Sequence, residues 1–260
     1  KFAVLGQEES CTGDPAKRAG NEFTFMMQAM QNIQVLDGYQ IKKIVTACPH
    51  CFNTLKNEYP ELGGNYDVIH HTQLLNSLIR EGRLKIEGGS FKGKKITFHD
   101  PCYLGRANEE YEAPRELLQK LDAELVEMKR SKERSLCCGA GGAQMFKEPE
   151  KGSKDINILR TEEALRTNVD LIATGCPFCN TMLTDGVKNL NERKGYYNKA
   201  HKIVDGSDRE RTKFCSSTVV IRTRGSNSLV SGESSSTVFS AGWQANRPTI
   251  IWENIMVSCL

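Results

Sequence analysis

The sequence lacks the features that would place the protein in a membrane, in a secreted class or on nucleic acid. No apolar run approaches the roughly 18 to 20 residues that a membrane helix needs. No basic segment followed by an apolar one marks a secretory leader. The 35 Lys and Arg residues nearly balance the 32 Asp and Glu residues, and the net charge is +3. Because no basic block or basic-aromatic stripe is present, we expect no nucleic-acid partner.

Cysteine, by contrast, is abundant, with ten in 260 residues. A disulfide-stapled secreted domain is usually short and rich in loops, whereas a chain of this length can build a substantial core. We therefore expect a cytoplasmic protein whose cysteines stay reduced and bind a metal or cluster.

Eight of the cysteines form two copies of one spacing. Cys11 precedes Cys48 by 37 residues and Cys138 precedes Cys176 by 38, and both copies end in a Cys-x-x-Cys turn. The second copy comprises Cys102, Cys137, Cys138, Cys176 and Cys179, and the first comprises Cys11, Cys48 and Cys51. This repetition indicates a duplicated, thiolate-rich metal site. The other two cysteines, Cys215 and Cys259, lie outside both copies and receive no role.

The first copy lacks two cysteines of the second. When Cys11 is aligned with Cys138, Ser10 takes the position of Cys137. The counterpart of Cys102 would fall before residue 1, and the first residue is Lys1 and not Met. The sequence therefore predicts that the natural protein extends upstream and that the first site is incomplete in this chain.

The apolar pattern predicts an α/β fold with two repeated units. Short apolar strands are expected at residues 2–5, 44–46, 66–70, 95–99, 125–128 and 171–174, and helices at 23–36, 52–58, 72–81, from Pro114 onward and at 155–166. Such alternation predicts mostly parallel sheets with helices on their faces. In the helix at 23–36, the expected core face is the stripe Phe23, Met26, Met27, Met30, Ile33 and Leu36.

The units are expected at residues 1–90 and 91–205. Residues 206–260 are rich in serine and carry no sustained periodicity, so we predict an irregular tail that is disordered or foreign to the domain. Cys48, Cys102 and Cys176 each follow a predicted strand closely. Ligands of parallel sheets gather at the carboxyl edge, so we expect these three thiolates at that kind of edge.

The number of sulfurs favours an iron–sulfur cluster at the second site. Structural zinc needs four ligands, whereas a multi-iron cluster can use all five cysteines with one thiolate bridging. Gly139 and Gly141 would let the backbone approach and donate N–H groups to sulfur. At the first site, an upstream cysteine would complete four thiolates for a cubane 4Fe–4S cluster. Within this chain, three thiolates with His50, His70 or His71 could instead hold zinc, or these histidines could be solvated or hydrogen-bonding side chains.

The sequence around these cysteines resembles that of a known protein family. Residues 9–15 read ESCTGDP, residues 99–106 read HDPCYLGR, and the pair Cys137 and Cys138 precedes a glycine. This pattern is similar to the cysteine-rich CCG domain of heterodisulfide reductase and of the iron–sulfur subunits of glycolate, lactate and glycerol-3-phosphate dehydrogenases. The resemblance spans residues 1 to about 190.

The resemblance implies two CCG domains in a pseudo-twofold arrangement and a noncubane 4Fe–4S cluster held by the five cysteines of the second copy. It implies an electron partner, either a ferredoxin-like cluster domain or a flavoprotein, and membrane association through the missing upstream region. In heterodisulfide reductase such a cluster works on a disulfide, whereas in the dehydrogenases the domain conducts electrons. Ser10 departs from the family pattern, so a noncubane cluster is not implied at the first site.

We therefore predict an iron–sulfur oxidoreductase component that serves a disulfide substrate or a flavin dehydrogenase and quinone chain. His99, Asp100 and Arg106 flank Cys102 and are candidates for handling protons or binding an anionic substrate. Alternatively, Asp100 only caps a turn before Pro101 and Arg106 only neutralises the cluster. Two other functions stay open at this point, a zinc-stabilised binding module without a redox role and a thiol-redox protein that uses Cys-x-x-Cys directly.

Overall fold

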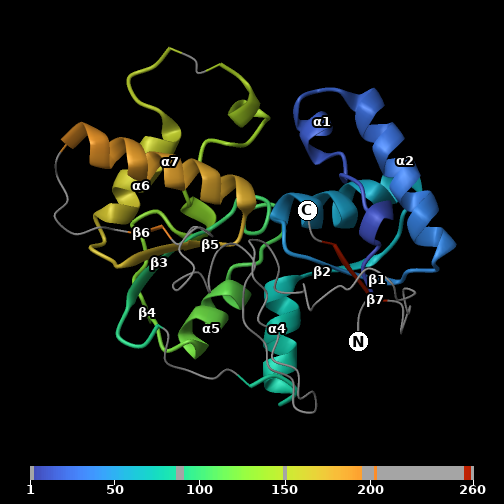
Figure 1. Ribbon diagram of the computed structural model, residues 1–260, viewed down its shortest axis with the longest axis horizontal. Helices are drawn as coiled ribbons and strands as arrows, with labels where there is room; N and C mark the ends of the chain where they lie inside the picture. The colour runs from blue at the N-terminus through green and yellow to red at the C-terminus, as the bar shows by residue number, and fades with distance from the viewer. Residues whose placement is uncertain (1–2, 86–90, 149–150, 195–201, 204–254, 259–260) are drawn as a thin grey trace.

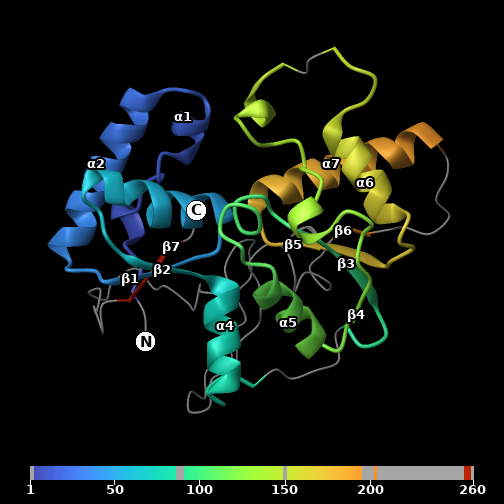
Figure 2. The ribbon, with the colours of Figure 1, turned by 180° about the vertical axis from the view of Figure 1, so that it is seen from behind.

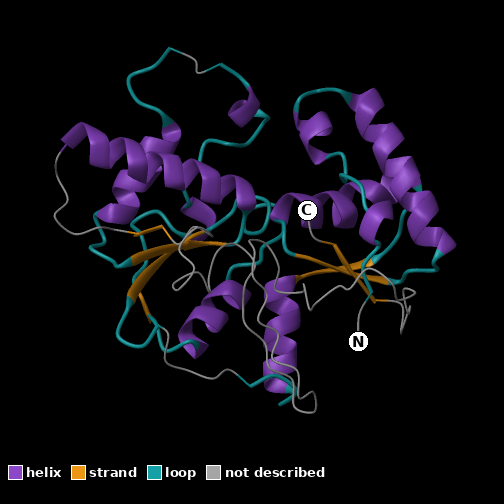
Figure 3. Ribbon diagram, in the orientation of Figure 1, coloured by secondary structure: helices purple, strands orange, loops and turns teal. Residues whose placement is uncertain are grey.

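The computed structural model describes residues 3–85, 91–148, 151–194, 202–203 and 255–258. Two α/β units lie side by side in it, each built on a small parallel sheet (Figures 1 and 2). Helices cover both faces of each sheet (Figure 3). This arrangement confirms the predicted fold class, whereas the exact unit boundaries at 90 and 205 stay a prediction.

The first unit has a three-stranded sheet in the order β2-β1-β7, with all pairs parallel. Its strands are β1 (Lys43–Thr46), β2 (Asp67–His70) and β7 (Ile255–Ser258), and its helices are α1 (Asp14–Arg18), α2 (Glu22–Gly38), α3 (Pro49–Asn53) and α4 (His71–Arg80). A π-helical turn, Thr54–Glu58, extends α3, and 3-10 turns occupy Gly6–Glu8 and Tyr59–Leu62.

The second unit has a four-stranded parallel sheet in the order β4-β3-β5-β6. Its strands are β3 (Lys95–His99), β4 (Glu124–Leu125), β5 (Leu171–Thr174) and β6 (Lys202–Ile203), and its helices are α5 (Glu112–Lys120), α6 (Ile156–Leu165) and α7 (Pro177–Lys194). Short 3-10 turns occupy Lys132–Arg134 and Gln144–Phe146. Helices α6 and α7 lie on one side of this sheet and α5 lies on the other (Figure 1).

The duplication seen in the sequence is also present in space. Strands β1 and β5 each run into a Cys-Pro step, and the proline takes the first turn of the following helix. Proline suits that position because its missing N–H has no partner there anyway. Strand β7 lies beside β1 as β3 lies beside β5. Four residues of the predicted irregular tail (206–260) thus form β7 in the first sheet, and residues 206–254 and 259–260 of that tail lie outside the described residues.

Helix α2 forms where its spacing predicts, but the predicted buried face was wrong for four of its six residues, whereas Leu36 is buried and Ile33 packs against the core. Phe23 is 75 % exposed, and Met26, Met27 and Met30 are exposed as well. The buried side chains are Phe25, Ala29, Asn32 and Leu36. Apolar side chains spread over more than half of the helix circumference, so periodicity alone could not select the buried face. On the buried face, the Asn32 amide donates to the Tyr59 hydroxyl at 3.0 Å and to the Cys11 carbonyl at 2.9 Å.

Most of the other element predictions hold with small shifts. Strands β3 and β5 have the predicted bounds, whereas helix α5 begins at Glu112, two residues before Pro114. Strand β4 covers Glu124–Leu125 and stops short of the predicted 125–128. The strand predicted at residues 2–5 was wrong in the described part, where Ala3 is an isolated bridge and Val4 and Leu5 belong to no strand.

Helices α4 and α5 join the two units. They pack against each other at the centre of the molecule, around the buried Leu75, Leu84 and Leu117 (Figures 1 and 2). The Asn76 amide donates to the Ala113 carbonyl at 3.0 Å within this contact. Because this seam buries apolar side chains from both units, it stabilises their relative position.

Candidate metal centre

The carboxyl ends of β3 and β5 bring distant cysteines together. Cys102 follows β3 by three residues and Cys176 follows β5 by two, and the strands are neighbours in the sheet. The loop that carries the adjacent pair reaches the same edge. Hydrogen-bonding contacts then link five thiols in one chain, which runs through Cys102, Cys137, Cys138, Cys179 and Cys176.

The pKa values of these five thiols are shifted in different directions. Hydrogen bonds from Cys102 and Cys138 lower the pKa of Cys137, and the bond between Cys102 and Cys137 raises the pKa of Cys102. Burial opposes ionisation of Cys176, but hydrogen bonds from Cys179 and His50 lower its pKa to about 5. The Cys137 contact raises the pKa of Cys138 to about 12. A site that stabilises two thiolates beside three more sulfurs is suited to bind cations.

Two backbone N–H groups lie close to the Cys137 sulfur. Gly139 has φ of +97°, which suits glycine, and its N–H donates to Cys137 Sγ at 3.3 Å. The Gly141 N–H also donates to Cys137, and a Cβ at Gly141 would lie 3.9 Å from that sulfur. The two glycines therefore supply the N–H donors that thiolate or sulfide needs near a cluster.

The first site would comprise the three remaining described cysteines, Cys11, Cys48 and Cys51, of which Cys48 and Cys51 are in direct contact. Cys48 and Cys51 share a hydrogen bond that lowers the pKa of Cys48 and raises that of Cys51. The Thr12 hydroxyl lies 3.5 Å from Cys51 Sγ, and the Gly13 N–H donates to Cys11 Sγ at 3.4 Å. Ser10, in the position of Cys137, donates its hydroxyl to Asn32 at 2.6 Å. In this chain Ser10 therefore supports the loop through hydrogen bonds.

The two sites meet across equivalent positions of the repeat. His50 and Phe178 occupy the same place in the two Cys-x-x-Cys turns, and their ring centroids lie 4.7 Å apart. His50 Nδ1 lies 2.7 Å from Asp14 Oδ2. Burial lowers the affinity of this ring for a proton, but hydrogen bonds to Asp14 and Cys176 outweigh it and raise its pKa to about 10. A cationic imidazole from the first unit thus adjoins a thiolate of the second.

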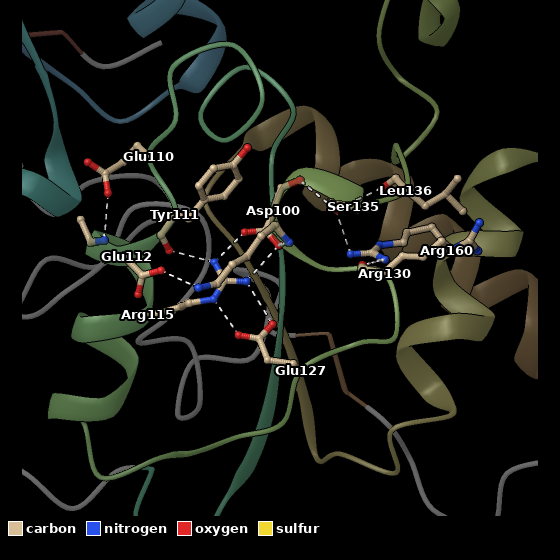
Figure 4. Close-up of polar contacts among 12 residues, drawn as sticks. Asp100, Glu110, Tyr111, Glu112, Arg115, Glu127, Arg130, Ser135, Leu136 and Arg160 are labelled. Atoms are coloured by element: carbon tan, nitrogen blue, oxygen red, sulfur yellow. Dashed lines mark hydrogen bonds and ion pairs between the residues drawn. The ribbon is translucent and has the colours of Figure 1, made fainter.

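The three polar residues predicted around Cys102 have different surroundings. Asp100 is buried and accepts from Arg115 Nη1 at 2.7 Å and Nη2 at 3.0 Å, and Arg115 also bonds Glu127 (Figure 4). Arg106 is exposed and donates to the carbonyl of Ser135, two residues before Cys137. These contacts hold loops near the cysteines, and a catalytic part for the residues stays a prediction.

His99 lies directly against the second site. A ring nitrogen of His99, Cys138 Sγ and Cys179 Sγ are all within 4.8 Å of one another. Burial and the neighbouring Arg160 lower the pKa of His99 to about 3. Arg160, which is completely buried, donates from Nε to His99 Nδ1 at 2.9 Å.

Sequence reasoning missed Arg160 and Arg115, and it did not connect His50 with Asp14. The one available signal was an arginine inside the predicted helix 155–166, two residues after the apolar Ile158. His70 and His71 lie at the end of β2, and burial lowers the pKa of both, to about 4 for His71. His70 bonds Thr72 and the Ala47 carbonyl, which matches the hydrogen-bonding alternative left open for it.

The donor set of the second site fits an iron–sulfur cluster better than a single ion. Five sulfurs in one contact chain exceed the four ligands of structural zinc, and soft thiolates are the ligands that clusters prefer. All eight cysteines in the described part of the chain are free thiols. None of the described helices combines the length and apolar character required to cross a membrane.

Comparison with known proteins agrees with this geometry. Residues 1–56 and 96–184 match the family described as "CCG: Cysteine-rich domain". The chain is 45% identical over 193 residues to the "EtfAB:quinone oxidoreductase" of Syntrophomonas wolfei, covering 72% of this chain and 27% of that protein. It is 48% identical over 188 residues to the "Probable iron-sulfur-binding oxidoreductase FadF" of Bacillus subtilis, covering 72% of this chain and 26% of that protein.

A more distant relative is one component of the dihydromethanophenazine:CoB–CoM heterodisulfide reductase of Methanosarcina barkeri. The identity is 39% over 197 residues, which cover 72% of this chain and 46% of that relative. The chain thus spans from about a quarter to under half the length of these relatives. The family match covers more than half of the chain and includes all eight cysteines of the two sites, and the chain therefore belongs to the family of proteins with the cysteine-rich CCG domain.

Proposed function

We propose that the chain is the cluster-bearing part of an iron–sulfur oxidoreductase and that it passes electrons through a 4Fe–4S cluster of the noncubane type at the second site. The observation that carries this proposal is the contact chain of five thiols from three separate segments. Such a cluster supplies one-electron chemistry at iron when it is bound. Cys102, Cys137, Cys138, Cys176 and Cys179 would hold it, and Gly139 and Gly141 would donate N–H groups to sulfur.

The first site would act as a relay. Cys11, Cys48 and Cys51 offer three thiolates, and a fourth ligand from outside this chain would complete a cubane 4Fe–4S site. Cys48 and Cys176 are close enough for the charge of one thiolate to affect the pKa of the other. His50 contacts the second site from the first unit, so electrons have a short route between the two.

The partners of the electron transfer follow from the relatives and remain part of the proposal. A relative is named an EtfAB:quinone oxidoreductase and another a component of a heterodisulfide reductase. We therefore propose a flavoprotein or a ferredoxin-like cluster domain as electron donor, and a quinone or a disulfide as acceptor. The relative from Chromohalobacter salexigens is named a probable membrane-anchored ferredoxin, which supports action at a cytoplasmic membrane face.

Iron and sulfide analysis after anaerobic purification tests the cluster directly. We expect about four iron and four sulfide atoms at the second site, and a visible and electron paramagnetic resonance spectrum that changes in Cys137→Ser. Cys215→Ser, a cysteine outside both repeats, is the matched control and should leave the spectrum unchanged. Iron far below four atoms per chain together with stoichiometric zinc would favour the zinc-stabilised binding module instead, and Cys137→Ser would then have little effect.

A further inference from the structure

Arg160 connects two of the three segments that carry the second site's cysteines. It is completely buried, and all three nitrogens of its guanidinium donate hydrogen bonds. Nη1 donates to the Arg130 carbonyl at 2.8 Å and Nη2 donates to the Ser135 hydroxyl at 3.1 Å (Figure 4). Nη1 also donates to Glu163 at 3.2 Å. The third nitrogen, Nε, reaches His99 Nδ1. The guanidinium therefore holds the end of β3 and the loop before Cys137 at fixed positions.

The contact between Arg160 and His99 has only one possible polarity. A guanidinium has five N–H donors and no acceptor, and it stays protonated in proteins. His99 Nδ1 must therefore accept at 2.9 Å with its lone pair and carry no proton. In a neutral imidazole the single proton then belongs to Nε2.

This tautomer decides what His99 can do for the neighbouring sulfurs. Its position within 4.8 Å of Cys138 Sγ and Cys179 Sγ would otherwise suit a ligand of a shared metal ion. Coordination through Nε2 needs a lone pair on that nitrogen, which the proton occupies. The lone pair of Nδ1 is directed at Arg160. Neither nitrogen is free to bind a metal, whereas Nε2–H can donate a hydrogen bond.

We propose that Arg160 is a positioning residue that locks His99 as an Nε2–H donor to the sulfurs of the second site, so that His99 is a hydrogen-bonding partner of the site and not a metal ligand. The effect of this contact on redox potential rests on the proposed cluster. Hydrogen bonds to cluster sulfurs raise a reduction potential because they stabilise the more negative, reduced state. The tautomer itself does not depend on any bound group.

The first test measures the tautomer in the full chain before any metal is loaded. A long-range proton–nitrogen correlation spectrum of protein with ¹⁵N-labelled histidine distinguishes the two neutral forms, and the His99 signals are those missing in His99→Phe. We expect an unprotonated Nδ1 and a protonated Nε2, and a shift toward a mixture in Arg160→Met. Arg115→Met removes another buried arginine of the same unit that does not bond His99, and it should leave the tautomer unchanged.

The second test measures the midpoint potential of the loaded protein. Loss of one N–H donor in His99→Phe should change the ratio of reduced to oxidised cluster about tenfold, which lowers the potential by about 59 mV for one electron. A protonated Nδ1 in the wild type, or an unchanged potential in loaded His99→Phe, would overturn the inference. If the wild type takes up no iron, the proposed function fails, and the tautomer measurement still decides the inference. The wild-type spectrum also decides it if Arg160→Met does not fold.

Discussion

Replacing Asp100 with asparagine would show whether this carboxylate is structural or catalytic. Asp100 and Arg115 are both 4 % exposed and form a bidentate ion pair. Asp100 also accepts the backbone N–H of Lys132 at 2.8 Å. The Asp100→Asn variant keeps the size of the side chain but leaves the buried guanidinium with one carboxylate, that of Glu127.

The expected loss is large because the pair is buried. Removing one partner of a buried ion pair typically costs about 3 to 5 kcal/mol, since it leaves an uncompensated charge. Glu127 still neutralises Arg115, so we expect a loss of about 3 kcal/mol, at the lower end of this range. Glu127 is the matched control. Its side chain is 37 % exposed, and pairs in contact with solvent contribute about 1 kcal/mol or less, so Glu127→Gln should cost much less.

Urea unfolding of the metal-free, reduced protein measures these free energies, and the spectrum of the reconstituted protein reports the site. We expect Asp100→Asn to lower the free energy of unfolding and to leave the cluster spectrum in place once the protein is folded. A loss below about 1 kcal/mol, accompanied by a loss of turnover, would refute the structural assignment and favour the proton-handling alternative for Asp100.

Two further predictions concern packing and pH. Gly186→Ala should cost about 1 to 3 kcal/mol of unfolding free energy, because its Cβ would lie 2.1 Å from Thr161 Oγ1 between α6 and α7. Gly38→Ala is the control, because a Cβ at Gly38 meets no neighbour within 4 Å. It should leave the free energy of unfolding unchanged or raise it by up to about 1 kcal/mol. Equal losses of stability in the two glycine variants would contradict this reasoning. Burial lowers the pKa of His71 to about 4, below its value of about 6.5 in an unfolded chain. The neutral His71 therefore makes its full contribution to the free energy of unfolding above about pH 6.5, and this contribution is lost as the pH falls toward about 4. Between pH 7 and 4, the free energy of unfolding of the wild type should fall by up to about 3 kcal/mol more than that of His71→Gln. Parallel plots of this free energy against pH for the two proteins would refute the assignment.

The sequence by itself determined the duplication, the parallel α/β plan and the cysteines that converge. These features are local or periodic. The apolar residues of β3 and β5 identify both segments as short buried strands, and both have the predicted bounds. A Cys-Pro step after a strand predicts a turn into a helix, because proline favours the first helical position. Once the strands are parallel neighbours, their carboxyl ends place Cys102 and Cys176 at one edge without further information.

Only the tertiary structure decided the polar partners of the site and the buried face of α2. Arg160 meets His99 across 61 positions of the chain and Asp14 meets His50 across 36, and no local pattern encodes a contact of that range. From the sequence alone, Arg160 and Asp14 could each have been a solvated charge on the surface. Burial makes the difference, because a charge removed from water must find a partner, and which one it finds depends on how the helices pack. The sequence of α2 likewise does not specify which of its apolar faces is buried. In the structure the buried face is the one on which Asn32 bonds Tyr59.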